Sequence, residues 1–267
     1  MKLKIIDKTS KEIGQKDLPS QFNEPVREDL IQRAVLAIES HNRQPYGAKI
    51  GAGMRASAKL SRRRHNYKGS YGHGISRVPR KIMSRSGTRF NWVGAVAPGT
   101  VGGRKAHPPK ASKIWDQKIN KKENQKAIRS AMAATLSKEA VELRGHIVPA
   151  HYPFIITSDI EAISKTKDIK QALLGVGLES EISRLTKKIR AGKGKTRGRK
   201  YKITKGPLIV VSGECNLTKA AANLTGIDIV EAKKLNAKLL APGAHPGRLT
   251  LWTDRSIDLI KKEGLFQ

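Results

Sequence analysis

The stretch Leu208-Ile209-Val210-Val211, followed by the polar run Ser212-Gly213-Glu214-Cys215, decides the fold class of this chain. Four consecutive aliphatic residues next to a Ser-Gly pair are typical of a buried strand. A helical pattern starts at about Leu217, directly after the polar run. A strand followed by a helix is the unit from which parallel sheets covered by helices are built.

Two more strand-like runs are followed by helical patterns in the same way. Residues 154–157 precede a helix predicted from about Ile160, and residues 249–253 precede a last helix that Asp254 is expected to cap. This alternation predicts an α/β fold, a three-layer, parallel-sheet, Rossmann-like globular domain with helices on both faces.

The N-terminal region predicts a short β-hairpin around Leu3, Ile5 and Ile13, and then a helix with Pro25 at its first position. The buried stripe expected on this helix follows helical spacing, with Val26, Leu30, Ala34 and Ile38 as its members.

A second long helix is predicted after residue 120. Asn120 and Glu123 have the spacing of a capping box, and Gly145 is expected to end the helix. Apolar residues continue at helical spacing between these ends, at Ile128, Met132, Leu136 and Ala140.

Residues 40–115, between the two long helices, have an unusual composition. They hold 17 Lys and Arg residues, no Asp or Glu, 11 of the 24 glycines and half of the aromatic residues. Their apolar residues are isolated and interrupted by Gly and Pro, so this tract lacks the material of a core. Arginines suit phosphates, aromatic rings suit exposed bases, and glycines permit close backbone approach, which predicts an extended arm that orders on RNA. A solvated, disordered linker is the alternative.

A second acid-free tract, residues 182–213, adds 11 basic residues to a chain of formal net charge +31. Its first part is predicted to end a helix, and residues 184–205 as a whole are predicted to form a basic surface loop. A solvated run of charge is the alternative. So large an excess of positive charge indicates a permanent polyanionic partner, for which nucleic acid is the default.

No cofactor is predicted. The string Gly51-Ala52-Gly53-Met54-Arg55-Ala56 matches a dinucleotide fingerprint, but it does not follow a strand. The string Gly194-Lys195-Thr196 lacks the earlier glycine of a phosphate loop. The polar residues 158–159 and 212–215, at the carboxyl ends of two predicted strands, are expected to cap helices.

No metal site or catalytic residue is predicted either. The seven histidines have no metal-binding spacing, and the single cysteine, Cys215, is interpreted as a small buried apolar side chain. No apolar run approaches the roughly 18 residues of a membrane span, and the N-terminus becomes charged too early for a signal peptide. The expectation is a soluble, cytoplasmic protein without a membrane partner, formed by one globular domain over residues 1–267 that the arm interrupts.

Several strings, in chain order, resemble the archaeal and eukaryotic branch of the L4 family of large-subunit ribosomal proteins. The more specific ones contain Arg-Lys-Ala-His-Pro-Pro and Gly-Arg-Lys-Tyr. The strings lie at residues 55–58, 77–80, 102–110, 127–131, 190–202 and 241–249. The chain is similar to the family over essentially its whole length and has the archaeal length, without a long C-terminal extension.

The resemblance implies a globular α/β domain on the outside of the large ribosomal subunit, and an arm that passes through ribosomal RNA to the wall of the peptide exit tunnel. The implied partners are large-subunit ribosomal RNA, neighbouring large-subunit ribosomal proteins and the nascent peptide. The implied function is structural and not enzymatic.

The predicted RNA-binding residues are cations for phosphates and aromatic residues for bases. Those in the arm are Arg43, Arg55, Arg62, Arg63, Arg64, Tyr67, Lys68, Tyr71, Arg77, Arg80, Lys81, Arg85, Arg89, Trp92, Arg104, Lys105, His107 and Lys110. Those in the second basic tract are Arg190, Lys193, Lys195, Arg197, Arg199, Lys200, Tyr201 and Lys202. Two alternative functions are an RNA-binding regulator that acts on messenger RNA and an RNA-modifying enzyme.

Overall fold

The computed structural model describes residues 1–66 and 69–267, and of residues 82–85 and 89–90 it describes only the backbone. In this structure the aliphatic run that starts at residue 208 forms a central strand. It belongs to a six-stranded sheet with the strand order β2-β1-β5-β10-β8-β9. Strands β1 and β2 pair antiparallel, and the other neighbouring strands pair in parallel. The strands are β1 (Lys2–Ile6), β2 (Glu12–Asp17), β5 (Ile155–Ile156), β8 (Leu208–Val211), β9 (Asp228–Glu231) and β10 (Thr250–Thr253).

Successive residues of β8 enter two different hydrophobic clusters. Leu208 and Val210 belong to one cluster, whereas Ile209 and Val211 belong to the other. All four side chains are fully buried. Since neighbouring side chains of a strand point to opposite faces, the sheet has a core on each face.

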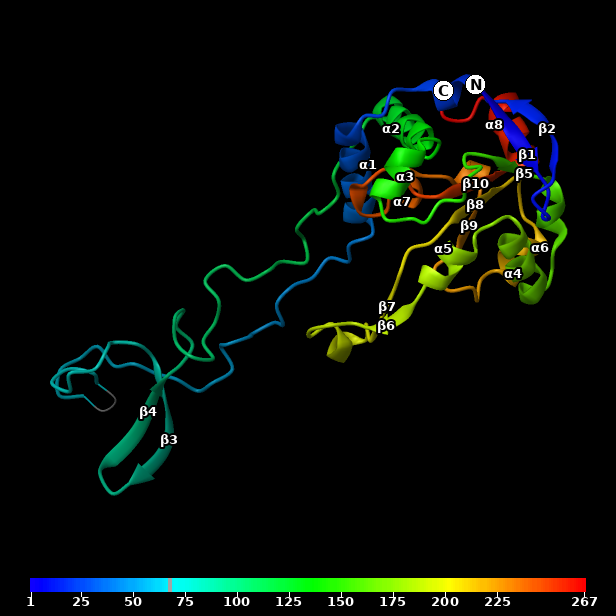
Figure 1. Ribbon diagram of the computed structural model, residues 1–267. Coiled ribbons are helices and arrows are strands. Elements are labelled where there is room, and N and C mark those ends of the chain that lie inside the picture. The colour runs from blue at the N-terminus through cyan, green and yellow to red at the C-terminus, as the bar shows by residue number, and fades with distance from the viewer. Residues whose placement is uncertain (67–68) are drawn as a thin grey trace. The chain divides into compact units, whose positions relative to one another are not determined.

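Helices cover both of these cores (Figure 1). The first cluster includes residues of α1 (Glu28–His41), α2 (Lys121–Ala134), α7 (Ala237–Leu240) and α8 (Asp254–Lys262). The second includes residues of α3 (Lys138–Leu143), α4 (Thr166–Gly175) and α6 (Asn216–Ala220), with α5 (Glu179–Arg184) packed at its border through Ile182. The three-layer α/β fold is therefore confirmed.

Helix α1 begins three residues after the predicted position of its first residue, so the role given to Pro25 is wrong. The Ser130 hydroxyl of α2 donates to the Pro25 carbonyl oxygen at 3.0 Å and accepts the Arg27 N–H at 2.6 Å. These bonds hold the backbone before the helix against α2. Val26 is consequently exposed, and the fully buried positions of α1 are Ile31, Ala34, Val35 and Ala37.

The second long helix is broken into α2 and α3, and its predicted capping box does not form. Asn120 occupies the N-cap, but its side chain makes no capping hydrogen bond. Glu123 instead pairs with Arg33 of α1, with Nη1 and Oε1 2.9 Å apart. After α2 ends, Ser137 starts α3 by accepting the Ala140 N–H.

The two predicted helix starts that follow strands β5 and β10 are also corrected. A short 3-10 helix, η2 (Ser158–Ala162), occupies the region of Ile160, and α4 begins only at Thr166. At the last helix the cap is Thr253, whose hydroxyl oxygen accepts the Ser256 N–H, whereas Asp254 pairs with Lys16.

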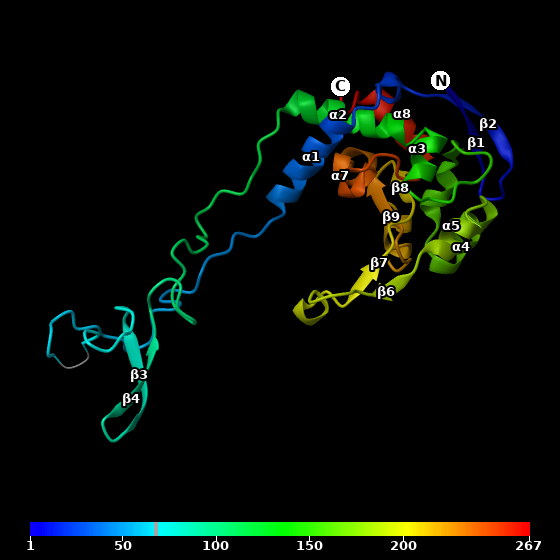
Figure 2. The same ribbon diagram turned by 60° about the vertical axis from the view of Figure 1, so that its left-hand side comes forward.

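Several strands were not predicted. Strand β9 is an edge strand of the sheet, and its four residues are only half buried. Its sequence accordingly has only two apolar residues between two acidic ones, which is a weak pattern for predicting a strand. The two basic tracts each contain an antiparallel pair, β3 (Arg80–Ser86) with β4 (Arg89–Gly94), and β6 (Lys187–Ile189) with β7 (Tyr201–Ile203). Figure 2 shows β3 beside β4 and, in the other unit, β6 beside β7. A helix does end in the first part of the second tract, at Arg184 of α5, but residues 187–189, which the prediction included in that helix end, form a strand.

The chain divides into two compact units, Met1–His41 with Asp116–Gln267, and Asn42–Trp115. The first unit contains the sheet and both hydrophobic clusters. Within it, the Ser40 hydroxyl oxygen accepts the Gln117 N–H at 2.9 Å and so joins the two segments that flank the second unit. Among the helices of the described chain, none has the length and apolar character needed to cross a membrane.

Remaining short 3-10 turns connect these elements. They are η1 (Ser20–Asn23), η3 (Lys195–Arg197), η4 (Ala232–Lys234) and η5 (Pro242–Ala244).

Candidate nucleic-acid interface

Unit Asn42–Trp115 is called the arm from here on, and two of its segments lie side by side. The Ala48 N–H donates to the Pro109 carbonyl oxygen at 3.0 Å. Farther along, Gly53 has a φ of +76°, and a Cβ there would lie 2.3 Å from the Arg104 backbone nitrogen. The second glycine of the string that matches a dinucleotide fingerprint therefore permits two backbone segments to meet.

Aromatic rings and cations gather where these segments begin and end. The rings of Tyr46 and Trp115 are stacked, with centroids 5.7 Å apart and planes at 18°. The Arg43 guanidinium lies 3.7 Å from the Trp115 ring centroid, and the Lys113 ammonium lies 4.2 Å from it. A similar contact places Arg77 5.0 Å from the Tyr71 ring centroid. In these contacts the aromatic faces hold cations in place, which pre-positions positive charge.

The cations of the arm have no carboxylate within their own unit, because residues 42–115 contain no Asp or Glu. Apart from the ring contacts above, their described hydrogen bonds are made with backbone and hydroxyl oxygens. Arg55 donates to the Ile50 carbonyl oxygen at 3.2 Å, and Arg80 donates to the Ser76 carbonyl oxygen at 3.1 Å. The positive charge of the arm is therefore not balanced by carboxylates within that unit.

Most of the predicted RNA-binding residues of the arm are exposed. Arg80, Lys81 and Trp92 are half buried. Tyr67 and Lys68 lie outside the described residues, and so do the side chains of Arg85 and Arg89. The exposed residues are Arg43, Arg55, Arg62, Arg63, Arg64, Tyr71, Arg77, Arg104, Lys105, His107 and Lys110.

The second basic tract is a hairpin of β6 and β7, called the basic hairpin below. Arg190 is only half exposed because it is used within the hairpin, where it donates to the carbonyl oxygens of Arg199 at 3.0 Å and Tyr201 at 3.3 Å. Its neighbours along the tip are exposed, and the Lys187 ammonium lies 4.3 Å from the Tyr201 ring centroid. These exposed residues are Lys193, Lys195, Arg197, Arg199, Lys200, Tyr201 and Lys202.

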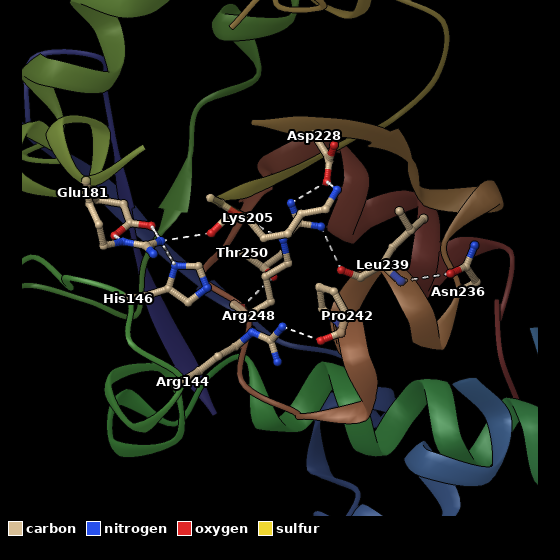
Figure 3. Close-up of polar contacts among 12 residues, drawn as sticks. Arg144, His146, Glu181, Lys205, Asp228, Asn236, Leu239, Pro242, Arg248 and Thr250 are labelled. Atoms are coloured by element: carbon tan, nitrogen blue, oxygen red, sulfur yellow. Dashed lines mark hydrogen bonds and ion pairs between the residues drawn. The ribbon is translucent and has the colours of Figure 1, made fainter. Parts of the chain in front are cut away.

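One root of the basic hairpin is fixed by Glu181, a buried carboxylate in the first turn of α5 (Figure 3). Glu181 accepts two bonds from Arg184, at 2.5 and 2.8 Å, one from the Ile147 N–H at 2.9 Å, and contacts His146 Nδ1 at 2.7 Å. Burial by itself raises the pKa of Glu181, but these bonds outweigh it and lower the pKa to about 2. Arg184 also donates to the Lys205 carbonyl oxygen at 2.9 Å, which ties the far end of the hairpin to α5.

The other root is fixed by Arg248, which is fully buried. Its guanidinium donates to the carbonyl oxygens of Gly206 at 2.9 Å and Leu239 at 3.0 Å, and to the Asp228 carboxylate at 2.6 Å. Nearby, Arg144 donates to the carbonyl oxygens of Pro242 and His245, and burial together with the charge of Arg248 lowers its pKa to about 10. Sequence reasoning missed both arginines, since neither the one that ends α3 nor the one shortly before β10 carries a local signal that it is buried.

The polar residues that follow β5 and β8 are not used as predicted. No side chain of residues 158–159 or 212–215 caps η2 or α6. Ser212 instead donates to the buried Glu161 carboxylate, through its N–H at 3.0 Å and its hydroxyl at 2.7 Å, and Thr253 donates to it at 2.7 Å. These donors satisfy the Glu161 oxygens, because a polar group is costly to bury without hydrogen bonds. Cys215 is half buried and occupies the N-cap of α6.

Comparison with known proteins identifies relatives along the whole chain. The family described as Ribosomal protein L4/L1 family matches residues 16–263. A large ribosomal subunit protein uL4 from Nanoarchaeum equitans is 49% identical over 268 residues, which cover 100% of both chains. Proteins of the same name from Methanothrix thermoacetophila and Archaeoglobus fulgidus are 42% and 41% identical, over 98% and 97% of this chain and 99% and 98% of theirs.

Proposed function

Since the chain belongs to the ribosomal protein L4/L1 family, we propose that it is a structural component of the large ribosomal subunit that binds ribosomal RNA through the arm and the basic hairpin. The family consists of ribosomal structural proteins, so the chain is not an enzyme. Its work is binding, done in the cytoplasm on the ribosome.

The observation that supports this proposal best is the difference in charge pairing between the two units. In the unit that contains the sheet, cations such as Lys4, Arg129 and Arg248 have carboxylate partners. The arm contains 17 Lys and Arg residues and no carboxylate at all. An array of positive charge that the protein leaves uncompensated is expected where phosphates neutralise it.

The arm is the part proposed to pass among RNA segments and to reach the wall of the peptide exit tunnel. It contains the isolated, exposed apolar residues Ile50 and Val101 and has no share in the two hydrophobic clusters of the sheet. Its exposed arginines are suited to phosphates, and its exposed Tyr71 is suited to an unpaired base. Neighbouring large-subunit proteins and the nascent peptide are the further partners proposed for it.

The basic hairpin is proposed as a second RNA contact, on the unit that contains the sheet. Its tip, with Arg197, Arg199 and Lys200, is exposed and without described carboxylate partners. Both roots are fixed to the sheet unit, through Arg184 and Arg248. A charged tip on a fixed root binds phosphates with less loss of conformational entropy than a free loop would.

Sedimentation of the tagged full chain from a cell lysate tests the proposal. The chain is expected to move with intact ribosomes and, after the subunits are dissociated, with the large subunit. A matched chain lacking residues 60–97 is expected to bind more weakly. Recovery of the full chain at the top of the gradient, or with the small subunit, would overturn the proposal.

A further inference from the structure

The stacked rings of Tyr46 and Trp115 leave part of the Tyr46 ring exposed. The two ring centroids are 5.7 Å apart, and the cations of Arg43 and Lys113 lie over the Trp115 ring. The Tyr46 side chain nevertheless remains half exposed, at 50%. An exposed ring that is already held by a second ring is a rigid platform for a further flat group.

A groove of about 620 Å³ opens beside this platform. The two rings line it together with Pro108, Pro109 and a set of basic residues. This volume falls in the range of about 300–1,000 Å³ that small-molecule sites have. The basic residues in the lining are Lys105, His107, Lys110 and Lys113.

The chemistry of this groove selects its ligand. Its lining combines an aromatic platform with ammonium groups and includes no carboxylate. A ligand that satisfies both features carries a flat ring and negative charge in adjacent positions. A nucleotide has this combination, because every base offers a π-face next to its phosphates.

Trp115 adds a second and independent sign of a polar ligand. Its indole Nε1–H is buried and has no hydrogen-bond partner among the described residues. A buried donor without an acceptor costs free energy. Phosphate oxygens and base carbonyls are acceptors of the kind that this donor lacks, whereas an apolar ligand offers none.

We propose that this groove binds one unpaired nucleotide of an RNA strand, with its base stacked on Tyr46 and its phosphates paired with Lys105 and Lys110. The inference rests on the proposed RNA-binding function, since the RNA around the arm supplies the strand. A strand is favoured over a free nucleotide because more arm cations, including Lys49 and Arg104, border the adjoining groove and extend the phosphate contacts. Tyr46 is then a base-stacking residue, and Trp115 supports it from behind.

The test measures binding of the full chain to a single-stranded RNA of about twelve adenosines and to an abasic oligomer with the same number of phosphates. Replacement Tyr46→Leu is expected to weaken binding to the adenosine strand about tenfold and to leave binding to the abasic oligomer unchanged. Tyr46→Phe is expected to keep the wild-type affinity for both. A 2-aminopurine base in the strand is expected to lose fluorescence on binding to the wild type and to Tyr46→Phe, and to lose less on binding to Tyr46→Leu.

Thermal unfolding of each variant provides the folding control, because neither hydrophobic cluster includes Tyr46. Equal losses on both oligomers would show that Tyr46 only shapes the arm, and no loss on either would show that the groove takes no base. Displacement of the strand by micromolar AMP would reassign the groove to free nucleotides, and displacement by an acidic peptide would reassign it to protein. In these four cases the inference fails while RNA binding and sedimentation with the large subunit stand. A wild-type chain that neither binds RNA nor sediments with ribosomes would overturn the proposed function itself.

Discussion

The Arg248 guanidinium and the Asp228 carboxylate form an ion pair whose arginine is almost wholly buried. Nη2 and Oδ2 lie 2.6 Å apart, and the side chains are 1% and 31% exposed. Burial by itself raises the pKa of Asp228, and the charges and hydrogen bonds of Arg248 and Lys205 reverse this and lower it. Because Arg248 also donates to the Gly206 carbonyl oxygen, the pair connects β9 to the root of the basic hairpin.

Removal of the Arg248 charge is predicted to destabilise the sheet unit. Replacement Arg248→Met removes the buried donor of the Asp228 carboxylate, which keeps only the exposed Lys205, and also removes the donor of the Gly206 and Leu239 carbonyl oxygens. We expect the free energy of unfolding to fall by about 3–5 kcal/mol. Urea denaturation followed by circular dichroism measures it. The matched control is Lys205→Met, because Lys205 pairs with the same carboxylate from an exposed position. This control is expected to cost less than about 1 kcal/mol, and equal losses in the two variants would contradict the prediction.

Acid is predicted to weaken the contacts of Glu181. Its pKa is about 2 in the folded chain and 4.5 ordinarily, so the ionised form favours folding. The stabilisation is fully present above about pH 4.5 and is lost as the pH falls toward 2, with a size on the order of 3 kcal/mol.

Unfolding free energies measured from pH 7 to pH 2 test this dependence. Glu181→Gln is expected to be less stable at neutral pH and to show a flatter decline in acid than the wild type. Glu139→Gln, at an exposed position of α3, serves as the control and is expected to follow the wild-type curve. A Glu181→Gln curve parallel to that of the wild type would refute the assignment.

The tip of the basic hairpin is predicted to bind RNA phosphates. Replacement of Arg197, Arg199 and Lys200 together by Ala is expected to weaken RNA binding and to flatten its dependence on salt. Each lost phosphate contact removes about 0.7–0.9 from the slope of log K against log salt. The hairpin itself is expected to survive, because Arg190 bonds to backbone oxygens there.

A control variant with the same change in net charge is available on the sheet unit. Lys233, Lys234 and Lys238 are paired with Glu263, Glu231 and Glu39. Their triple replacement by Ala is expected to leave the salt slope nearly unchanged. If both triple variants change the slope equally, the hairpin acts only through the net charge of the protein.

The arm is predicted to be dispensable for folding. Replacement of residues 60–97 by a short Gly-Ser turn is expected to leave the thermal midpoint almost unchanged, because both hydrophobic clusters lie in the other unit and loop closure depends weakly on length. The shortened chain is expected to bind the large subunit more weakly and to lose crosslinks to a nascent peptide. Loss of cooperative unfolding would place the arm in the core, and undiminished crosslinking would refute its proposed place at the tunnel.

Local sequence patterns determined most of the sheet, apart from the edge strand β9, and the two basic tracts. Strand β8 could be predicted because a strand that is buried on both faces of a sheet reads as a continuous run of aliphatic residues, and residues 208–211 are such a run. The same reasoning found β10 to within one residue and indicated helices on both sides. The two acid-free tracts required no structure either, since composition alone shows uncompensated charge.

Contacts between residues far apart in the sequence decided the helix boundaries, the aromatic stack and the buried arginines. Local sequence patterns cannot predict such contacts. Helix α1 starts at Glu28 because Ser130, 103 residues from Arg27, binds the backbone before it. Tyr46 and Trp115 could be noted as aromatic residues, but only the fold stacks them beside a groove. Arg248 reads as an ordinary surface cation, and it is buried because tertiary structure brings Gly206, Asp228 and Leu239 around it. A buried charge is tolerated only when such partners surround it, and only the folding of the whole chain brings these distant residues together.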